Sequence, residues 1–270
     1  MSRVSSDLRA LRSLAERAAR RGGEVVRSGA GERAAEDKGA GDYVTEVDRA
    51  SERAILDLLA AETPDVQVLA EEDGGRAGGV DEDRYWVVDP LDGTTNFVHG
   101  LPLVGVSVAL VDEGRPLVGA IHAPFLEETW VAARGEGAFG LREGAREEPV
   151  RLRVSTRPPN RAVVGTGFPF RRKDLLPEYL QVFRWALTRF EDLRRPGAAA
   201  LDLAWVAAGV FDGFFELALS TWDVAAGGLL IEEAGGVVTD WNGGGDWLAG
   251  NIVAGPPAVH EELMELTRAE

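Results

Sequence analysis

The chain has 270 residues, of which 45% are hydrophobic and 27% are charged, and its formal net charge at pH 7 is −16. This composition is typical of a folded globular protein and excludes a chain that is disordered over most of its length. The negative charge argues against a general binder of nucleic acid or of anionic membranes, because both would be repelled. The sequence contains no cysteine, which excludes disulfides, thiolate metal sites and thiol nucleophiles.

Residues 1–12 lack the apolar core of a signal peptide, and no run approaches the roughly 18 apolar residues of a membrane-spanning helix. These features and the missing cysteines fit a cytoplasmic protein. A chain of this length can form one large domain or two smaller ones. The Gly-rich, charged segment 134–148 is the best candidate boundary, so we expect halves at 1–145 and 146–270 within one compact unit.

From the N-terminus, apolar residues at helical spacing predict an amphipathic helix over residues 7–26. The polar, glycine-containing segment 28–41 is predicted to be an exposed loop. A second helical pattern begins near Asp48, and either Asp48 or Ser51 could cap that helix. The short apolar run 66–70 is typical of a buried strand.

The strand over 66–70 ends in Glu71, which two further acids follow. Such a run is most often a solvated turn. Residues 85–88, the next apolar run, are β-branched or aromatic and predict a buried strand that leads directly into Asp89. Because Pro90 cannot donate to a strand ladder, we expect the chain to turn there.

Asp89 and Asp92 would then project from one tight turn. Gly93 allows a ligand to approach the backbone closely, and Thr94 and Thr95 are helix-capping residue types whose N–H groups could hold a phosphate. An Asp-Gly-Thr turn is also common without any chemistry. Two carboxylates beside a phosphate cradle nevertheless indicate metal-assisted phosphoryl chemistry, because Mg²⁺ prefers hard oxygen ligands.

The second half of the chain alternates strands and helices, which indicates α/β organisation. Strands are predicted over 103–111, 117–123, 129–133, 162–165, 214–217 and 251–255, and helices over 177–190, 198–209 and 258–266. The first two of these strands form a predicted hairpin. Asp223 begins another helix, in which small residues favour close packing; a carboxylate there is also a good cap.

Five elements of the sequence, in order from Lys38 to Gly236, resemble those of the inositol monophosphatase family of magnesium-dependent phosphatases. The string 86–100 (Trp-Val-Val-Asp-Pro-Leu-Asp-Gly-Thr-Thr-Asn-Phe-Val-His-Gly) resembles its first signature, and 222–236 resembles its second. An Asp-x-Val-Thr-x-x-Asp motif that ends at Asp48, with Lys38 upstream, resembles the early motif of the family. Glu71 with the next acid resembles its paired glutamates.

The resemblance implies a layered α/β fold, the αβαβα sandwich of the inositol monophosphatase and fructose-bisphosphatase type, and a homodimer. It implies a phosphomonoesterase that hydrolyses inositol monophosphate or a similar polyol or sugar phosphate with roughly two or three Mg²⁺ ions. Fructose 1,6-bisphosphate, histidinol phosphate, 3′-phosphoadenosine nucleotides and NADP stay open as substrates. A hypothesis of another class is a protein of this fold that acts mainly as a binding partner, and the intact set of acids argues against it.

The same resemblance assigns roles to individual residues. The metal ligands it implies are the carboxylates of Glu71, Asp89, Asp92 and Asp223 and the backbone carbonyl of Leu91, with Asp89 bridging two ions. The catalytic residues it implies are Glu71, Thr94 and Asp48, of which the last two form a hydroxyl–carboxylate relay to the attacking water. The substrate contacts it implies come from Gly93, Thr94, Thr95, Ala199 and Glu216. Glu216 would accept hydrogen bonds from substrate hydroxyls, unless it is a surface carboxylate at the end of a strand.

Overall fold

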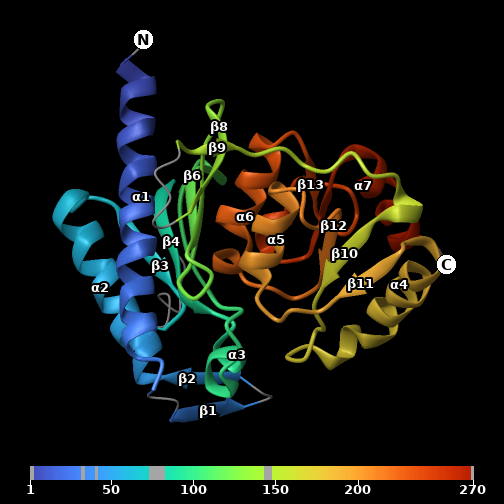
Figure 1. The fold of residues 1–270 in the computed structure, drawn as a ribbon, viewed down its shortest axis with the longest axis horizontal. Coiled ribbons are helices and arrows are strands. Elements are labelled where there is room, and N and C mark those ends of the chain that lie inside the picture. Colours follow the sequence, from blue (N-terminus) through green and yellow to red (C-terminus); the bar gives the residue numbers. More distant parts are fainter. Residues whose placement is uncertain (1–2, 32–33, 40–41, 73–82, 143–147, 269–270) are drawn as a thin grey trace.

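Five alternating layers of helix and sheet form the molecule (Figure 1). The computed structural model describes residues 3–31, 34–39, 42–72, 83–142 and 148–268. Two helices, a first sheet, two further helices, a second sheet and a last pair of helices follow one another across these ranges. The αβαβα sandwich that the sequence resemblance implies is therefore confirmed.

The first two layers come from the N-terminal part of the chain. The helices α1 (Arg3–Ser28) and α2 (Glu46–Glu62) cover the outer face of a seven-stranded sheet. The spatial order of its strands is β3 (Gln67–Ala70), β4 (Arg84–Asp92), β5 (Gly105–Asp112), β6 (Arg115–Ala123), β7 (Glu128–Ala133), β8 (Gly137–Arg142) and β9 (Val150–Arg151). Within the described residues, β3 and β4 are its one parallel pair. The predicted hairpin is β5 and β6.

The remaining layers come from the C-terminal part. The helices α5 (Ala199–Ala207) and α6 (Thr221–Glu233) lie between the two sheets, and α4 (Leu176–Arg189) and α7 (Pro257–Thr267) cover the far side. The second sheet has the order β11 (Asp192–Arg194), β10 (Val163–Thr166), β12 (Gly213–Glu216), β14 (Ile252–Gly255) and β13 (Val237–Thr239). Short helices complete the described chain: α3 (Thr94–His99), η1 (Pro159–Arg161), η2 (Lys173–Leu175) and η3 (Trp247–Ala249).

Strand β4 shows why its sequence is apolar without alternation. Trp86 and Val88 belong to the core beneath α1 and α2, whereas Val87 belongs to the core shared with α5 and α6. All three side chains are buried. A strand covered on both faces needs an unbroken apolar run, which is the pattern that precedes Asp89.

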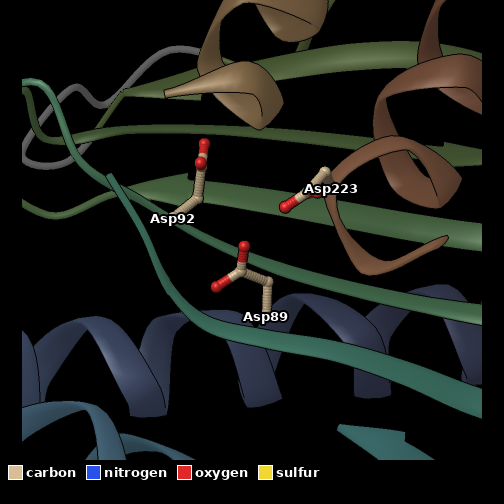
Figure 2. Close-up of side chains that lie close together, drawn as sticks. All are labelled: Asp89, Asp92 and Asp223. Atoms are coloured by element: carbon tan, nitrogen blue, oxygen red, sulfur yellow. The ribbon is translucent and has the colours of Figure 1, made fainter. Parts of the chain in front are cut away.

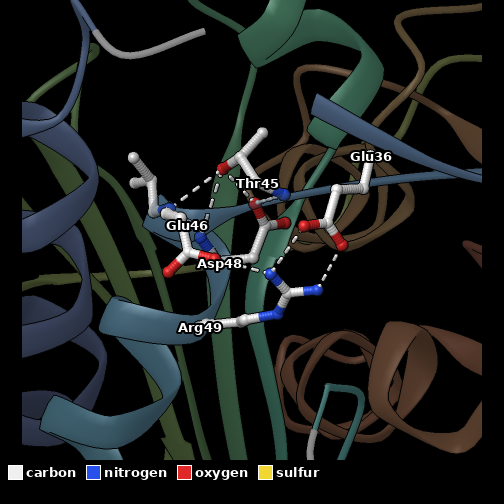
Figure 3. A network of polar contacts seen from close by, with 6 residues as sticks. Glu36, Thr45, Glu46, Asp48 and Arg49 are labelled. Carbon is white, nitrogen blue, oxygen red and sulfur yellow. Dashed lines mark hydrogen bonds and ion pairs between the residues drawn. The ribbon is translucent and has the colours of Figure 1, made fainter. Parts of the chain in front are cut away.

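The loop predicted over 28–41 is wrong in its second half. Strand β1 (Ala35–Gly39) pairs antiparallel with β2 (Asp42–Thr45), and Arg49 on α2 forms ion pairs with Glu36 of β1 (2.7 Å) and with Glu46 (2.6 Å) (Figure 3). A strand of charged residues shows no apolar alternation, so the sequence pattern did not reveal it. Residues 40–41 and the side chain of Lys38 lie outside the described residues.

The turn predicted at Pro90 is also wrong, because β4 continues through Pro90 to Asp92. Asp89 pairs with Ser107 and Asp92 with Gly105, so β4 contains one residue more than β5 over this stretch. This is a β-bulge, which tolerates the missing N–H of proline and re-aims the neighbouring side chains.

The candidate boundary segment 134–148 contains β8, and the first sheet extends to Arg151 in β9. The division of the chain into halves at residue 145 stays a prediction. No helix in the described ranges is both long and apolar enough to cross a bilayer.

Candidate active site

Three carboxylates converge where the bulge of β4 faces the start of α6. Oxygen atoms of Asp89, Asp92 and Asp223 lie within 4.8 Å of one another (Figure 2). Asp89 is only 1% exposed and Asp92 only 8%, whereas Asp223 is partly exposed. Burial, and then the charges of Glu71, Asp92 and Asp223, raise the pKa of Asp89 well above its ordinary value. Burial and the charge of Asp223 raise the pKa of Asp92 to about 7.

Like charges that are buried this closely are unfavourable unless they bind protons or cations. Each of the three carboxylates nevertheless accepts a backbone hydrogen bond that fixes its direction. Leu91 N donates to Asp89 Oδ1 (3.0 Å), Ala200 N to Asp92 Oδ2 (2.8 Å) and Ser220 N to Asp223 Oδ2 (2.6 Å). The three carboxylates could therefore hold a cation together.

Two helix ends supply these contacts. Ala200 lies in the first turn of α5, where the positive end of the helix dipole favours the Asp92 carboxylate. Ser220 is the N-cap of α6, and Asp223 is the third helical residue of a capping box. Asp223 therefore caps its helix and faces the other two acids at once, so the two interpretations of this residue are compatible.

The other two ligands implied by the resemblance lie beside this group. Glu71 follows β3, its N–H is bonded to the carbonyl of Val88 (3.3 Å), and it lines the same cavity of about 170 Å³ as Asp89 and Leu91. The Glu71 carboxylate is not among the oxygens within 4.8 Å, yet its charge contributes to the raised pKa of Asp89. Its role as a ligand stays a prediction.

Thr94 and Asp48 are in contact although 46 positions separate them in the chain. The Thr94 hydroxyl lies 3.0 Å from Asp48 Oδ1 and 3.1 Å from the carbonyl oxygen of Leu91. Thr45 donates its N–H (2.8 Å) and its hydroxyl to Asp48 Oδ2 (Figure 3). Burial raises the pKa of Asp48, and the bonds from Thr45 and Thr94 lower it by a smaller amount.

The cap of α2 differs from both predicted alternatives. Thr45 is the N-cap, and Asp48 is the third helical residue, whose carboxylate accepts a hydrogen bond from the N–H of Thr45. Ser51 instead donates its hydroxyl to the carbonyl of Pro90 (2.8 Å) and so supports the bulge of β4. One capping box therefore positions Asp48 for Thr94, and one hydroxyl on the same helix steadies the strand that carries Asp89.

The predicted substrate residues line the same cavity as the acids. Gly93 has a φ of 88° and caps α3, of which Thr94 and Thr95 are the first two residues. The first N–H groups of a helix have no acceptor within the helix, which suits a phosphate. Ala199 begins α5 and Glu216 ends β12. The structure thus brings all of them together, and their contacts with substrate stay predictions.

Gly167, Arg195 and Asp202 are among the residues of this cavity that the sequence did not indicate as part of the site. Asp202 is 1% exposed, and its burial together with the charge of Glu216 raises its pKa well above the ordinary value. The sequence does contain a feature that could have indicated Asp202, because it is the one acid in the apolar stretch 198–207. An acid within such a helix indicates a buried polar site rather than a solvated face.

The comparisons with known proteins agree with one another over nearly the whole chain. Nus factor SuhB from Pasteurella multocida (strain Pm70) is 42% identical over 259 residues, 93% of each chain. The structure of the extragenic suppressor protein suhB from Bartonella henselae has a TM-score of 0.87 at 38% identity, covering 96% of this chain and 98% of that one. Inositol monophosphatase from Anabaena (Nostoc) sp. PCC 7120 has a TM-score of 0.84 at 34% identity, with 96% of each chain covered. The family model matches residues 7–270, and the chain therefore belongs to the inositol monophosphatase family.

Proposed function

We propose that this protein is a magnesium-dependent phosphomonoesterase that hydrolyses inositol monophosphate or a similar polyol or sugar phosphate. One observation above all supports the proposal. The carboxylates of Asp89, Asp92 and Asp223, of which the first two are buried, share a cavity with Thr94, whose hydroxyl is bonded to Asp48, in a member of this family. The cytoplasmic location and the homodimer are parts of the same proposal.

The donor set fits a hard divalent cation, because it consists of oxygens alone and carries several negative charges. Asp89, Asp92 and Asp223 would hold the ions together with Glu71 and the carbonyl of Leu91. When bound, Mg²⁺ ions offset the negative charge of the site and of the phosphate, and they lower the pKa of a bound water.

The chain itself supplies orientation and proton transfer. The Thr94 hydroxyl donates to Asp48, so its oxygen can accept a hydrogen bond from the attacking water. The proton of that water passes toward Asp48, whose raised pKa makes it a stronger base than an exposed aspartate. The water oxygen bonds to phosphorus, the ester P–O bond breaks, and the leaving alkoxide oxygen takes a proton from solvent water and departs as the alcohol.

The substitution Asp89→Asn tests this proposal, because an amide cannot replace the charge of a ligand at the centre of the cluster. We expect phosphate release from inositol monophosphate with saturating Mg²⁺ to fall at least ~10²-fold, whereas the melting temperature measured in EDTA should not fall. Asp57→Asn, at an exposed acid of α2, is the matched control and should keep wild-type turnover. Turnover above about a tenth of wild type in Asp89→Asn would contradict the assignment.

The name of the relatives favours a second candidate, a role as a Nus factor. The variant Asp89→Asn also distinguishes the phosphatase function from the role as a Nus factor. If the chain acts mainly as such a factor, Asp89→Asn should still replace a Nus factor SuhB in a bacterium that lacks it. If hydrolysis is the required activity, the variant should fail where wild type succeeds.

A further inference from the structure

Asp202 presents a buried oxygen that the folded chain does not satisfy. Its Oδ1 is inaccessible to solvent and has no hydrogen-bond partner among the described residues. Asp202 lies on α5 between the buried residues Leu201 and Leu203, yet it also lines the cavity of the carboxylate cluster. Leaving a buried acceptor without a donor costs stability, so such a group is retained when a ligand supplies the donor.

Glu216 forms a second carboxylate at the same end of the cavity. It is buried at the end of β12, and its charge contributes to the raised pKa of Asp202. The room for it depends on Gly167, because a Cβ at that position would lie 2.0 Å from Glu216 Oε1. Any residue with a side chain at position 167 would therefore displace the Glu216 carboxylate.

Arg195 supplies a positive charge to these two acids from the rim of the cavity. Its guanidinium lies over the rings of Phe168 (5.8 Å) and Phe170 (5.3 Å), and its charge lowers the pKa of both Asp202 and Glu216. Stacking on aromatic rings fixes the group without using all of its N–H donors. Asp202 and Glu216 thus offer two acceptors to the cavity, with a nearby positive charge.

We propose that Asp202 is a specificity-determining residue that, beside Glu216, accepts a hydrogen bond from a substrate hydroxyl and so selects phosphate esters with neighbouring hydroxyl groups. This inference rests on the proposed phosphatase function. Asp202 follows Ala199 by about one helical turn, roughly 5 Å of rise. The N–H of Ala200 at the start of α5 donates to Asp92. A phosphate bound beside Asp92 would therefore place the attached polyol ring next to Asp202.

The first test compares two substrates in wild type and Asp202→Asn. For inositol monophosphate, KM should rise about tenfold or more, because an amide replaces the carboxyl group that would accept the hydrogen bond of the substrate hydroxyl. For phenyl phosphate, which has no hydroxyl, kcat/KM should change by less than about threefold. The same comparison is made with inositol phosphates that each lack one hydroxyl. For one of these substrates, Asp202→Asn should raise KM little further, because the hydroxyl that it lacks is the one that Asp202 would bind.

A stability measurement separates this role from a structural one. Asp202→Asn, and Asp202→Ala should the first variant fail to fold, should leave the melting temperature of the ligand-free protein unchanged or raise it. The matched control is Asp212→Asn, because Asp212 is buried but fully paired with Arg157 (2.6 Å) and with the N–H of Val163 (2.7 Å). This control should lower the melting temperature and leave the ratio of the two substrates unchanged.

The outcomes distinguish a failure of the phosphatase proposal from a failure of the role of Asp202. If wild type hydrolyses neither ester with Mg²⁺, the phosphatase proposal and this inference both fail. Suppose instead that wild type hydrolyses both esters. If Asp202→Asn then lowers kcat/KM equally for both, or raises KM for every deoxygenated substrate as much as for inositol monophosphate, the role of Asp202 alone is overturned. A fall in melting temperature comparable with that of Asp212→Asn would likewise make Asp202 a structural residue.

Discussion

The single hydrogen of the Thr94 hydroxyl has two acceptors within reach, Asp48 Oδ1 and the carbonyl oxygen of Leu91. A carboxylate is the stronger acceptor, so the hydrogen goes to Asp48 when that group is ionised. The lone pairs of the hydroxyl oxygen are then free to orient a water in the cavity. In the proposed mechanism, Thr94 would therefore set both the position of the attacking water and the path of its proton.

Replacing Thr94 tests that relay. We expect Thr94→Val, which keeps the shape of the side chain, to lower kcat by about 10²–10⁴-fold with little change in KM. Thr94→Ser keeps the hydroxyl and should stay within about tenfold of wild type. Steady-state rates of phosphate release measure both, and a valine variant as active as the serine variant would remove Thr94 from the mechanism.

Sequence reasoning reached Asp89 and Asp92 because both follow an apolar strand directly and are close in the chain. It could not reach Asp202 in the same way. Whether an acid on an apolar helix lies in a cavity depends on where that helix is placed, and α5 is positioned by contacts with strands about 100 residues earlier. The contact between Thr94 and Asp48 was inferred by resemblance alone, because no local pattern joins residues that far apart.

At the level of elements, the close packing of α6 requires glycines at its contacts with α5 and β6. Gly227 packs against Leu203 of α5, and Gly119 of β6 leaves room for Ala226. The predicted close packing behind Asp223 is therefore confirmed. Because α6 carries Asp223 into the carboxylate cluster, these contacts set the geometry of the site as well as the stability of the central layer.

The substitution Gly227→Ala tests this dependence. Alanine favours a helix by about 1 kcal/mol, but the added Cβ would lie 2.5 Å from Leu203 Cβ, closer than real contacts allow. We expect a net loss of about 1–3 kcal/mol in the free energy of unfolding and a fall in activity as Asp223 shifts. Gly245→Ala, which meets nothing within 4 Å, should change stability by less than about 0.5 kcal/mol. Equal denaturation midpoints for the two variants would contradict the packing argument.

The buried helices and strands were largely predictable, because their apolar residues repeat at the period of the element. The exceptions are elements defined by a partner. Strand β1 forms by pairing with β2, β8 lies in a Gly-rich stretch that pairs with β7, and the bulge at Pro90 exists because β5 and Ser51 hold it. None of these partners is visible in the local sequence.

For the whole molecule, folding concentrates negative charge that the unfolded chain keeps apart. Asp89 and Asp92 come from the first sheet, and Asp223 comes from the helix layer between the sheets. The pKa values of Asp89 and Asp92 are raised, so the folded protein holds protons that the unfolded chain releases near pH 4. The contribution of these two groups to stability therefore decreases as pH rises from about 4 to about 7, whereas acids with lowered pKa values, such as Asp112 and Asp240, contribute in the opposite direction. Asp202 and Glu216 act in the same direction as Asp89 and Asp92, while His260, whose pKa is lowered, acts in the opposite one.

The last prediction follows from this linkage. In EDTA, the melting temperature should be higher at pH 5.5 than at pH 8. Because Mg²⁺ must displace the protons of the cluster, its stabilising effect should be larger at pH 8 than at pH 5.5 by at least several degrees. The overall charge of −16 also destabilises the protein as pH rises, but one substitution hardly alters that term. Asp89→Asn should accordingly keep the general decline in EDTA and lose most of the stabilisation by Mg²⁺. A Mg²⁺-dependent increase in melting temperature that is the same at both pH values, or that survives in Asp89→Asn, would show that the cations bind elsewhere.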